Sequence, residues 1–132
     1  MTGDPWKRTL TLTGPRFSAN DRLHFRRRNE LVKIWRTLGE AHARALYVPR
    51  PLERAHVVVT QVPHSRGRVD PGNVAPAAKA AVDGIVRAGL LVDDDAAHMV
   101  GPDYRLAAEP VRQAPGMWTL RITITALDEE TQ

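Results

Sequence analysis

The sequence predicts an α+β domain, a two-layer sandwich in which two main helices cover one face of a mixed sheet of about four strands. Three observations support this prediction. Several segments alternate apolar and polar residues as half-buried strands do, and two others space apolar residues at helical intervals. The 132-residue chain is also long enough for one core and too short for two ordinary domains. We expect a single domain over residues 1–127 and a frayed acidic tail over 128–132.

The first half of the domain is expected to form a strand, a helix and a strand. Residues 6–14 alternate, with Leu10 and Leu12 on one side. Residues 29–47 carry an apolar stripe at helical spacing, with Asn29 as the expected N-cap. Residues 54–64 are rich in β-branched side chains and predict a second strand.

The second half is expected to form a loop, a helix and two strands. Residues 65–73 contain Gly and Pro and predict a loop, and residues 74–88 predict a helix that Gly89 ends. Residues 98–112 predict an irregular strand, and residues 117–127 predict a clearly alternating one. The turn at 114–116 predicts that these last two strands pair as a hairpin.

Composition excludes several classes of site. The chain has no Cys, which excludes disulfides and Cys-ligated zinc and fits a reducing cytoplasm. No stretch predicts a signal peptide or a membrane span, so we expect a cytoplasmic protein without a membrane partner. The three Trp residues lie in apolar patterns and are expected in the core rather than as base-stacking platforms.

Charge is divided unevenly along the chain. Residues 1–68 hold 14 Lys and Arg against 5 Asp and Glu, a net charge of +9. Residues 69–132 hold 5 against 10, a net charge of −5. This division predicts one surface that attracts a polyanion and one pocket that attracts cations, with chance clustering on solvated faces as the alternative.

Acidic residues flank the second predicted helix. Asp70 precedes it, and Asp93, Asp94 and Asp95 follow it. The run of three is either a solvated turn or a cation site, because adjacent carboxylates repel one another. A straight helix of this length would separate its two ends by roughly 20 Å, so a shared metal requires the loops to fold back. Lys79 and Asp83 are spaced i, i+4 and form either an ordinary exposed ion pair or part of a site.

The stretch "RGRVDPGNVAPAAKAAVDGIVRAGLLVDDD" resembles the signature of the RusA-like Holliday junction resolvases, endodeoxyribonucleases of phages and prophages. The resemblance covers about residues 6–126, including "LTLTGPRFSANDRLHF" near the N-terminus. Its central features fall in order: Arg66, Arg68, Asp70, Asn73, Lys79, Asp83-Gly84-Ile85, Ala88-Gly89 and Asp93-Asp94.

The resemblance implies hydrolysis of a DNA phosphodiester with Mg²⁺ or Mn²⁺. It implies Asp70 and Asp94 as direct metal ligands, with Asp93 and Asp83 as alternatives, and Lys79 as the group that stabilises transition-state charge. Asn73 either orients a metal-bound water or, as we expect, caps the second helix. Many members carry a second Asp where this chain has Gly72, and the lysine here lies three residues further on. Asp83, Asp93, Asp95 or water must then replace that carboxylate.

The basic half is expected to bind the substrate, a branched DNA such as a four-way junction. The residues expected to contact DNA are Arg22, Arg26, Arg27, Arg28, Lys33, Arg36, Arg66 and Arg68. A junction offers two equivalent strands, so we expect a homodimer. The alternatives are a junction-binding protein whose catalysis is weakened or lost, a nuclease of broader substrate specificity that also cuts flaps, and a small cation-binding or protein-interaction domain.

Overall fold

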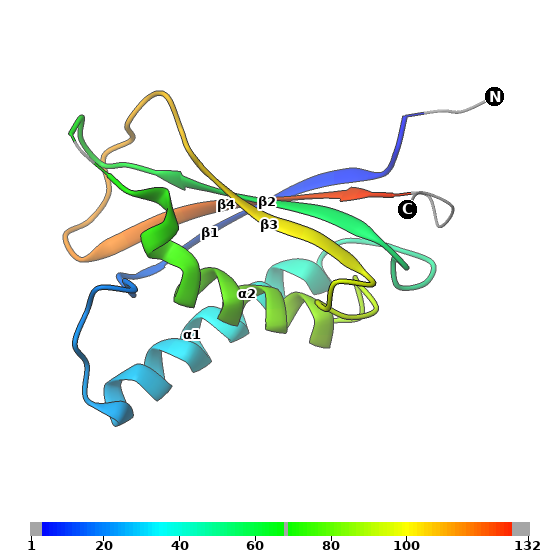
Figure 1. Cartoon of the computed structure of the whole chain (residues 1–132), viewed down its shortest axis with the longest axis horizontal. Coiled ribbons are helices and arrows are strands. Elements are labelled where there is room, and N and C mark those ends of the chain that lie inside the picture. The colour runs from blue at the N-terminus through cyan, green and yellow to red at the C-terminus, as the bar shows by residue number, and fades with distance from the viewer. Residues whose placement is uncertain (1–3, 68, 128–132) are drawn as a thin grey trace.

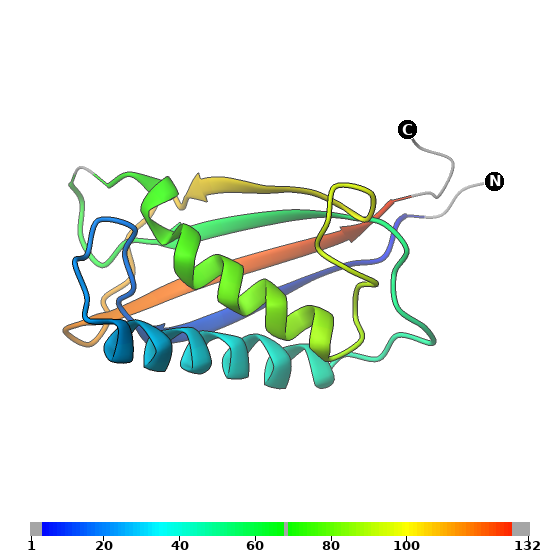
Figure 2. The ribbon, with the colours of Figure 1, turned by 60° about the horizontal axis from the view of Figure 1, so that its bottom comes forward.

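The computed structural model describes residues 4–67 and 69–127, and these form a two-layer α+β sandwich (Figure 1). The strands are β1 (Lys7–Pro15), β2 (Ala55–Val62), β3 (Met99–Leu106) and β4 (Met117–Ala126). The helices are α1 (Phe25–Arg44) and α2 (Ala75–Arg87), preceded by a short 3₁₀ helix, η1 (Pro71–Val74). Both α-helices lie on the same face of the sheet (Figure 2). The predicted fold class is therefore confirmed.

The sheet has the strand order β1-β4-β2-β3. β4 pairs antiparallel with both β1 and β2, and β3 pairs parallel with β2 at the edge. The predicted hairpin between the last two strands is therefore wrong, because β2 lies between them. β4 buries Leu120, Ile122 and Ile124 and takes a central position, whereas β3 fully buries none of its residues and occupies an edge.

The first helix begins four residues earlier than predicted. Its N-cap is His24, whose side chain accepts a hydrogen bond from the Arg26 backbone N–H at 3.2 Å. Asn29 is consequently inside the helix and does not cap it. Histidine lies outside the usual set of capping residues, which explains why the sequence pattern misplaces this boundary.

The two helices approach each other so closely that their backbones are in contact. A Cβ atom added at Gly84 of α2 would lie 2.0 Å from the Arg36 carbonyl oxygen, and one added at Gly39 of α1 would lie 2.1 Å from that of Ala81. Small residues on both helices permit this contact. The contact lies in the second half of α1, at Arg36 and Gly39.

The core fills the space between the helices and the sheet. Trp35 is fully buried there, and its indole N–H donates to the Pro15 carbonyl at 2.9 Å. Trp6 and Trp118 are only half-buried, and the guanidinium groups of Arg8 and Arg16 lie over their rings. Trp35 is thus a core residue as expected, and Trp6 and Trp118 are partly buried and pack against that core. No helix in the described residues is long and apolar enough to cross a membrane.

Candidate functional site

One face of α2 carries an ammonium group between two carboxylates. Lys79 Nζ lies 3.7 Å from Asp83 Oδ1 and 3.6 Å from Asp94 Oδ2. Lys79 and Asp83 are one helical turn apart, and the loop that follows α2 folds back to supply Asp94. The Lys79 side chain is 74% exposed, whereas that of Asp94 is 28% exposed. The structure therefore joins three of the predicted site residues in a cluster that solvent or a ligand can reach.

Burial raises the pKa of the Asp83 carboxyl above its ordinary value of 3.8. Lys79 opposes this shift, and the adjacent Asp94 carboxylate, which also shares a hydrogen bond with Asp83, adds to it. Two carboxylates compete for one ammonium group, so an additional cation or a proton at this position would relieve their repulsion.

The raised pKa of Asp83 predicts how an Asp83→Asn variant depends on pH. The pKa of Asp83 is higher in the folded protein than in the unfolded chain. Protonated Asp83 therefore contributes its full share to the free energy of unfolding below the unfolded-state pKa, and this contribution is lost as pH rises through the folded-state pKa. The variant should therefore match wild type near pH 3 and be more stable at pH 7, by no more than about 1 kcal/mol because the side chain is partly exposed. Urea unfolding at both pH values measures this. Lower stability of the variant at pH 7 would contradict it.

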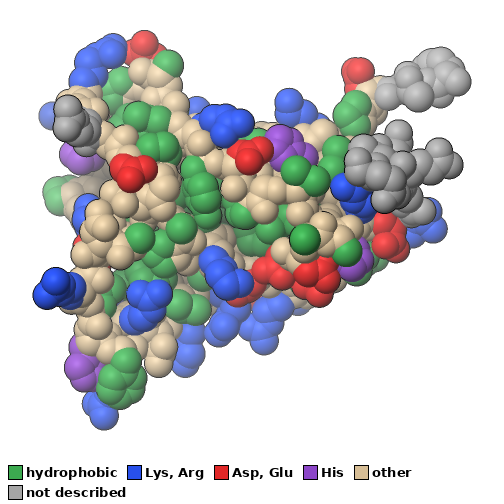
Figure 3. All heavy atoms as spheres, in the orientation of Figure 1, with side chains coloured by type: hydrophobic (Ala, Val, Ile, Leu, Met, Phe, Trp, Pro, Cys, Tyr) green, Lys and Arg blue, Asp and Glu red, His purple; other side chains and the backbone are tan. Residues whose placement is uncertain are grey.

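The three consecutive aspartates have three different partners. Asp93 Oδ1 accepts from the Asp94 backbone N–H at 2.7 Å, and Asp94 faces Lys79. Asp95 Oδ1 lies 2.5 Å from His98 Nδ1, and this hydrogen bond lowers the pKa of Asp95. The run is therefore a structured loop whose members point to different groups, and Asp94 is the one that belongs to the Lys79 cluster (Figure 3 shows acidic side chains gathered over the loop between α2 and β3).

Asp70 lies at the other end of α2. It is the N-cap of η1, and its Oδ1 accepts from the Gly72 backbone N–H at 2.9 Å. Asp70 lines one cavity, while Lys79 and Asp94 line another with Ala75 and Tyr104. Among the described residues, no group of three or more acidic or histidine side chains lies close enough to hold a metal ion. Within one chain, the structure thus does not gather Asp70 and the aspartate run into one ligand set.

Asn73 does not cap α2, contrary to our prediction. The N-cap of that helix is Val74, which makes no side-chain capping bond. The Asn73 side chain instead accepts from Asn20 Nδ2 at 3.3 Å, and its carbonyl accepts from the Ala19 N–H at 2.9 Å. These bonds fasten the loop after β1 to the turn that carries Asp70.

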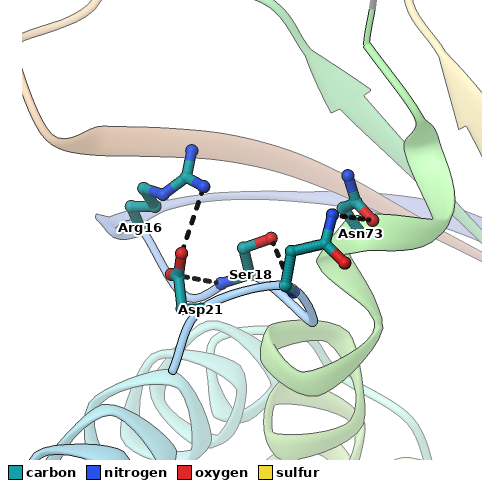
Figure 4. A network of polar contacts seen from close by, with 5 residues as sticks. Arg16, Ser18, Asp21 and Asn73 are labelled. Carbon is teal, nitrogen blue, oxygen red and sulfur yellow. Dashed lines mark hydrogen bonds and ion pairs between the residues drawn. The ribbon is translucent and has the colours of Figure 1, made fainter. Parts of the chain in front are cut away.

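A small polar network holds that loop in shape (Figure 4). Asp21 accepts from the Ser18 backbone N–H at 3.1 Å and from Arg16 Nη2 at 3.2 Å. The backbone bond first, and then Arg16, lower the pKa of Asp21. Ser18 Oγ accepts from the Asn20 N–H at 3.2 Å. The loop that leads from β1 to α1 is consequently positioned against η1.

A cavity of about 290 Å³ opens between this network and the sheet. Its walls include Asp70, Asn73, Ser18, Gln61 and Trp118. Sequence reasoning missed Gln61 and Trp118 as site residues. A signal for Gln61 was available, since it is a polar residue at an inward position of a strand whose other inward residues are Ala55, Val57 and Val59.

Most of the predicted DNA-contacting residues lie on or just before α1. Arg22, Arg26, Arg27, Arg28 and Lys33 are exposed, and basic side chains are prominent along the lower edge of Figure 3. Arg27 approaches Glu30 at 3.8 Å, and the guanidinium group of Arg28 lies 5.3 Å from the centre of the Phe17 ring. The first turns of the helix therefore present several exposed basic side chains, with the exposed Phe25 and Glu30 among them.

Arg66 lies in a different environment from the α1 cluster. Its Nη2 donates to Glu109 Oε2 at 2.8 Å, and both side chains are largely exposed. Arg68 lies outside the described residues, as does the predicted acidic tail at 128–132.

No protein-family model matches the chain, and no curated protein matches it.

Proposed function

We propose that the protein is a metal-dependent endodeoxyribonuclease that cuts four-way DNA junctions, the activity implied by its resemblance to the RusA-like resolvases. The observation that carries this proposal is the Lys79 ammonium group, which lies within 4 Å of both Asp83 and Asp94 on an exposed face of α2. An exposed ammonium held by two carboxylates suits a group that must meet a phosphate.

Lys79 is the residue we assign to transition-state stabilisation. Phosphodiester cleavage places an additional negative charge on the phosphoryl oxygens, and a positioned cation lowers the energy of that state. Asp83 and Asp94 restrain the flexible lysine side chain, so that the side chain loses less conformational entropy when the substrate binds.

The oxygen-rich side chains of this region fit a hard cation. Mg²⁺ needs only one or two carboxylates and retains several waters, so Asp70 or Asp94 alone can anchor an ion. Bound Mg²⁺ would supply an activated water and neutralise charge on the scissile phosphate. We propose that either Asp70 or Asp94 holds an ion within one chain, and the Asn73 amide lies beside Asp70 in the cavity wall.

The basic surface is proposed to bind the arms of the DNA. The hydrogen bonds from Ala19 and Asn20 to Asn73 place the segment that leads into α1 next to the Asp70 turn. Phosphates bound along α1 would therefore lie near the acidic residues, and binding should weaken steeply with salt. We further propose that a homodimer presents two such sites to the two equivalent strands of a junction.

A synthetic four-way junction, a flap and a plain duplex, each with Mg²⁺, Mn²⁺ or EDTA, test this function. We expect metal-dependent nicking that is fastest on the junction. Equal rates on the flap would support the broader nuclease. Salt-sensitive junction binding without nicking under any condition would support the inactive binding protein, for which the replacement of a carboxylate by Gly72 is the motivating observation.

Restoring a carboxylate at position 72 should strengthen metal binding. A Cβ atom at Gly72 would lie 3.3 Å from Asp70 Oδ1, so an aspartate there would place its charge beside that of Asp70 with a small local adjustment. Gly72→Asp should lower the Kd for Mn²⁺ by about tenfold, because affinity rises with ligand charge. Gly72→Asn is the matched uncharged control. Calorimetric titration giving equal Kd values for the two variants would contradict the placement of the ion at Asp70.

A further inference from the structure

The first turn of α1 exposes an aromatic ring to solvent. Phe25, the first residue of the helix, is 62% exposed, although phenylalanine is among the residue types most often buried. The other phenylalanine of the chain, Phe17, is fully buried. In Figure 1 this end of α1 lies at the lower edge of the molecule, away from the sheet. A ligand can therefore reach the Phe25 ring without any rearrangement of the protein.

A neighbouring ring supports Phe25 from one side. The centres of the His24 and Phe25 rings are 4.5 Å apart, and the angle between their planes is 32°. His24 is itself fixed, because its Nδ1 accepts a hydrogen bond from the Arg26 backbone N–H at 3.2 Å and so caps the helix. A side chain that is supported in this way loses less conformational entropy when a flat ligand stacks on it.

Positive charge surrounds the exposed ring. Residues 22–30 contain four Arg and one Glu, a net charge of +3. The guanidinium group of Arg26 lies 6.0 Å from the centre of the Phe25 ring, and Arg22 and Arg27 are exposed. Figure 3 shows hydrophobic, histidine and basic side chains together at this corner of the molecule. A flat apolar surface among cations suits a ligand that has a flat ring between negative charges, as a nucleotide within a strand has.

The loop that precedes Phe25 is joined to the turn that carries Asp70. Asn20 Nδ2 donates to Asn73 Oδ1 at 3.3 Å, and the Ala19 N–H donates to the Asn73 carbonyl at 2.9 Å. Phe25 follows Asn20 by five residues, and an extended chain of that length spans at most about 18 Å. Successive nucleotides of a duplex strand rise about 3.4 Å, so a few nucleotides bridge this distance. A DNA molecule that meets the Asp70 turn can therefore also reach Phe25.

We propose that Phe25, supported by His24, is a stacking platform for a base that is exposed at a branch point of the DNA, and that the neighbouring arginines bind the flanking phosphates. This inference rests on the proposed function, since it takes the ligand to be branched DNA. Every base has a flat π-face, so the platform would recognise an unstacked base rather than a sequence. A continuous duplex covers its base faces by stacking, and the contact would therefore favour branched DNA over plain duplex.

The test compares two strands of equal charge that differ in base content. One is a labelled thymidine strand, and the other is an abasic strand with the same number of phosphates. Both are titrated in EDTA, so that no cleavage occurs, and fluorescence anisotropy reports the Kd. For wild type we expect the thymidine strand to bind about tenfold more tightly, the scale of one base stacked on an aromatic side chain. Equal Kd values, or no binding of either strand, would overturn the proposal.

Phe25→Leu is the decisive variant, because leucine is apolar but has no ring. Its Kd for the thymidine strand should rise about fivefold to tenfold, whereas its Kd for the abasic strand should stay within about twofold of wild type. Phe25→Trp should retain the wild-type preference, because indole also stacks on bases. Position 25 is exposed, so both variants should melt at the wild-type temperature. A wild-type preference for the thymidine strand in Phe25→Leu would overturn the proposal.

Tyr47→Leu is the matched control. Tyr47 is 82% exposed and follows the other end of α1, so this variant also removes one exposed ring. It should retain the wild-type Kd for both strands. A loss of preference as large as that of Phe25→Leu would mean that any exposed ring has this effect, and would overturn the assignment to Phe25.

The test separates the stacking platform from the nuclease activity. Preference for the thymidine strand without junction cleavage in Mg²⁺ would support the platform and contradict the proposed function. Junction cleavage by a protein that binds both strands equally would support the proposed function and overturn the platform.

Discussion

Replacing Asp94 with asparagine is expected to slow junction cleavage by about 100- to 1,000-fold, the loss typical when a positioned charge that acts on the transition state is removed. The Asp94 carboxylate lies 3.6 Å from Lys79 Nζ and is the only member of the aspartate run that an ion pair among the described residues joins to that lysine. Its loss would release Lys79 on one side and remove a proposed metal ligand. Single-turnover cleavage of a labelled four-way junction measures the effect.

Asp95→Asn is the matched control for this variant. It removes the same charge from the same loop, but the Asp95 carboxylate bonds to His98 rather than to Lys79. We expect this control to cleave within a few-fold of wild type and to lose stability toward neutral pH. The stabilisation from the lowered pKa of Asp95 is present above its ordinary value of 3.8 and disappears as pH falls through the folded-state value. Equal cleavage by both variants would remove Asp94 from the mechanism.

Gly84→Ala is expected to cause the largest loss of stability of any substitution considered. Its new methyl group would lie 2.0 Å from the Arg36 carbonyl oxygen, which belongs to a helix backbone and cannot rotate away. α1 and α2 would have to separate, and overpacking of this kind costs about 3 kcal/mol or more. Urea unfolding monitored by tryptophan fluorescence measures the change.

Gly67→Ala provides the control for this substitution. A Cβ atom at Gly67 would have no neighbour within 4 Å among the described atoms, so the free energy of unfolding should change by less than about 0.5 kcal/mol. If Gly84→Ala were as stable as this control, the close packing of the helices would be wrong.

The sequence was sufficient to predict the layers of the fold but not the pairing of its last strands. Periodicity identifies β3 and β4 as strands, yet it does not say that β3 runs parallel to β2 after the crossover through α2. The short connection before β4 suggested a hairpin, whereas hydrogen bonds from Ala107 and Val111 guide that connection across the end of β2. The pairing of β3 and β4 with β2 therefore prevailed over the turn that residues 114–116 suggested.

The candidate site was predicted in part. The spacing of Lys79 and Asp83 indicated one helix face, and the structure adds Asp94 to it. The role of Asn73 was misjudged because its partner, Asn20, lies 53 residues away in sequence. Gln61 was missed although it is the one polar residue at an inward position of β2, a pattern that the sequence analysis did not use.

Locating Mn²⁺ by anomalous scattering in crystals soaked with the ion tests the central claim most directly. The account predicts an ion bound by the Asp70 or Asp94 carboxylate, either within one chain or between two copies related by a twofold axis. Calorimetry on Asp70→Asn and Asp94→Asn should then show weakened binding. Ions found only at sites remote from both residues, or no bound ion at millimolar concentrations, would contradict the metal-dependent mechanism.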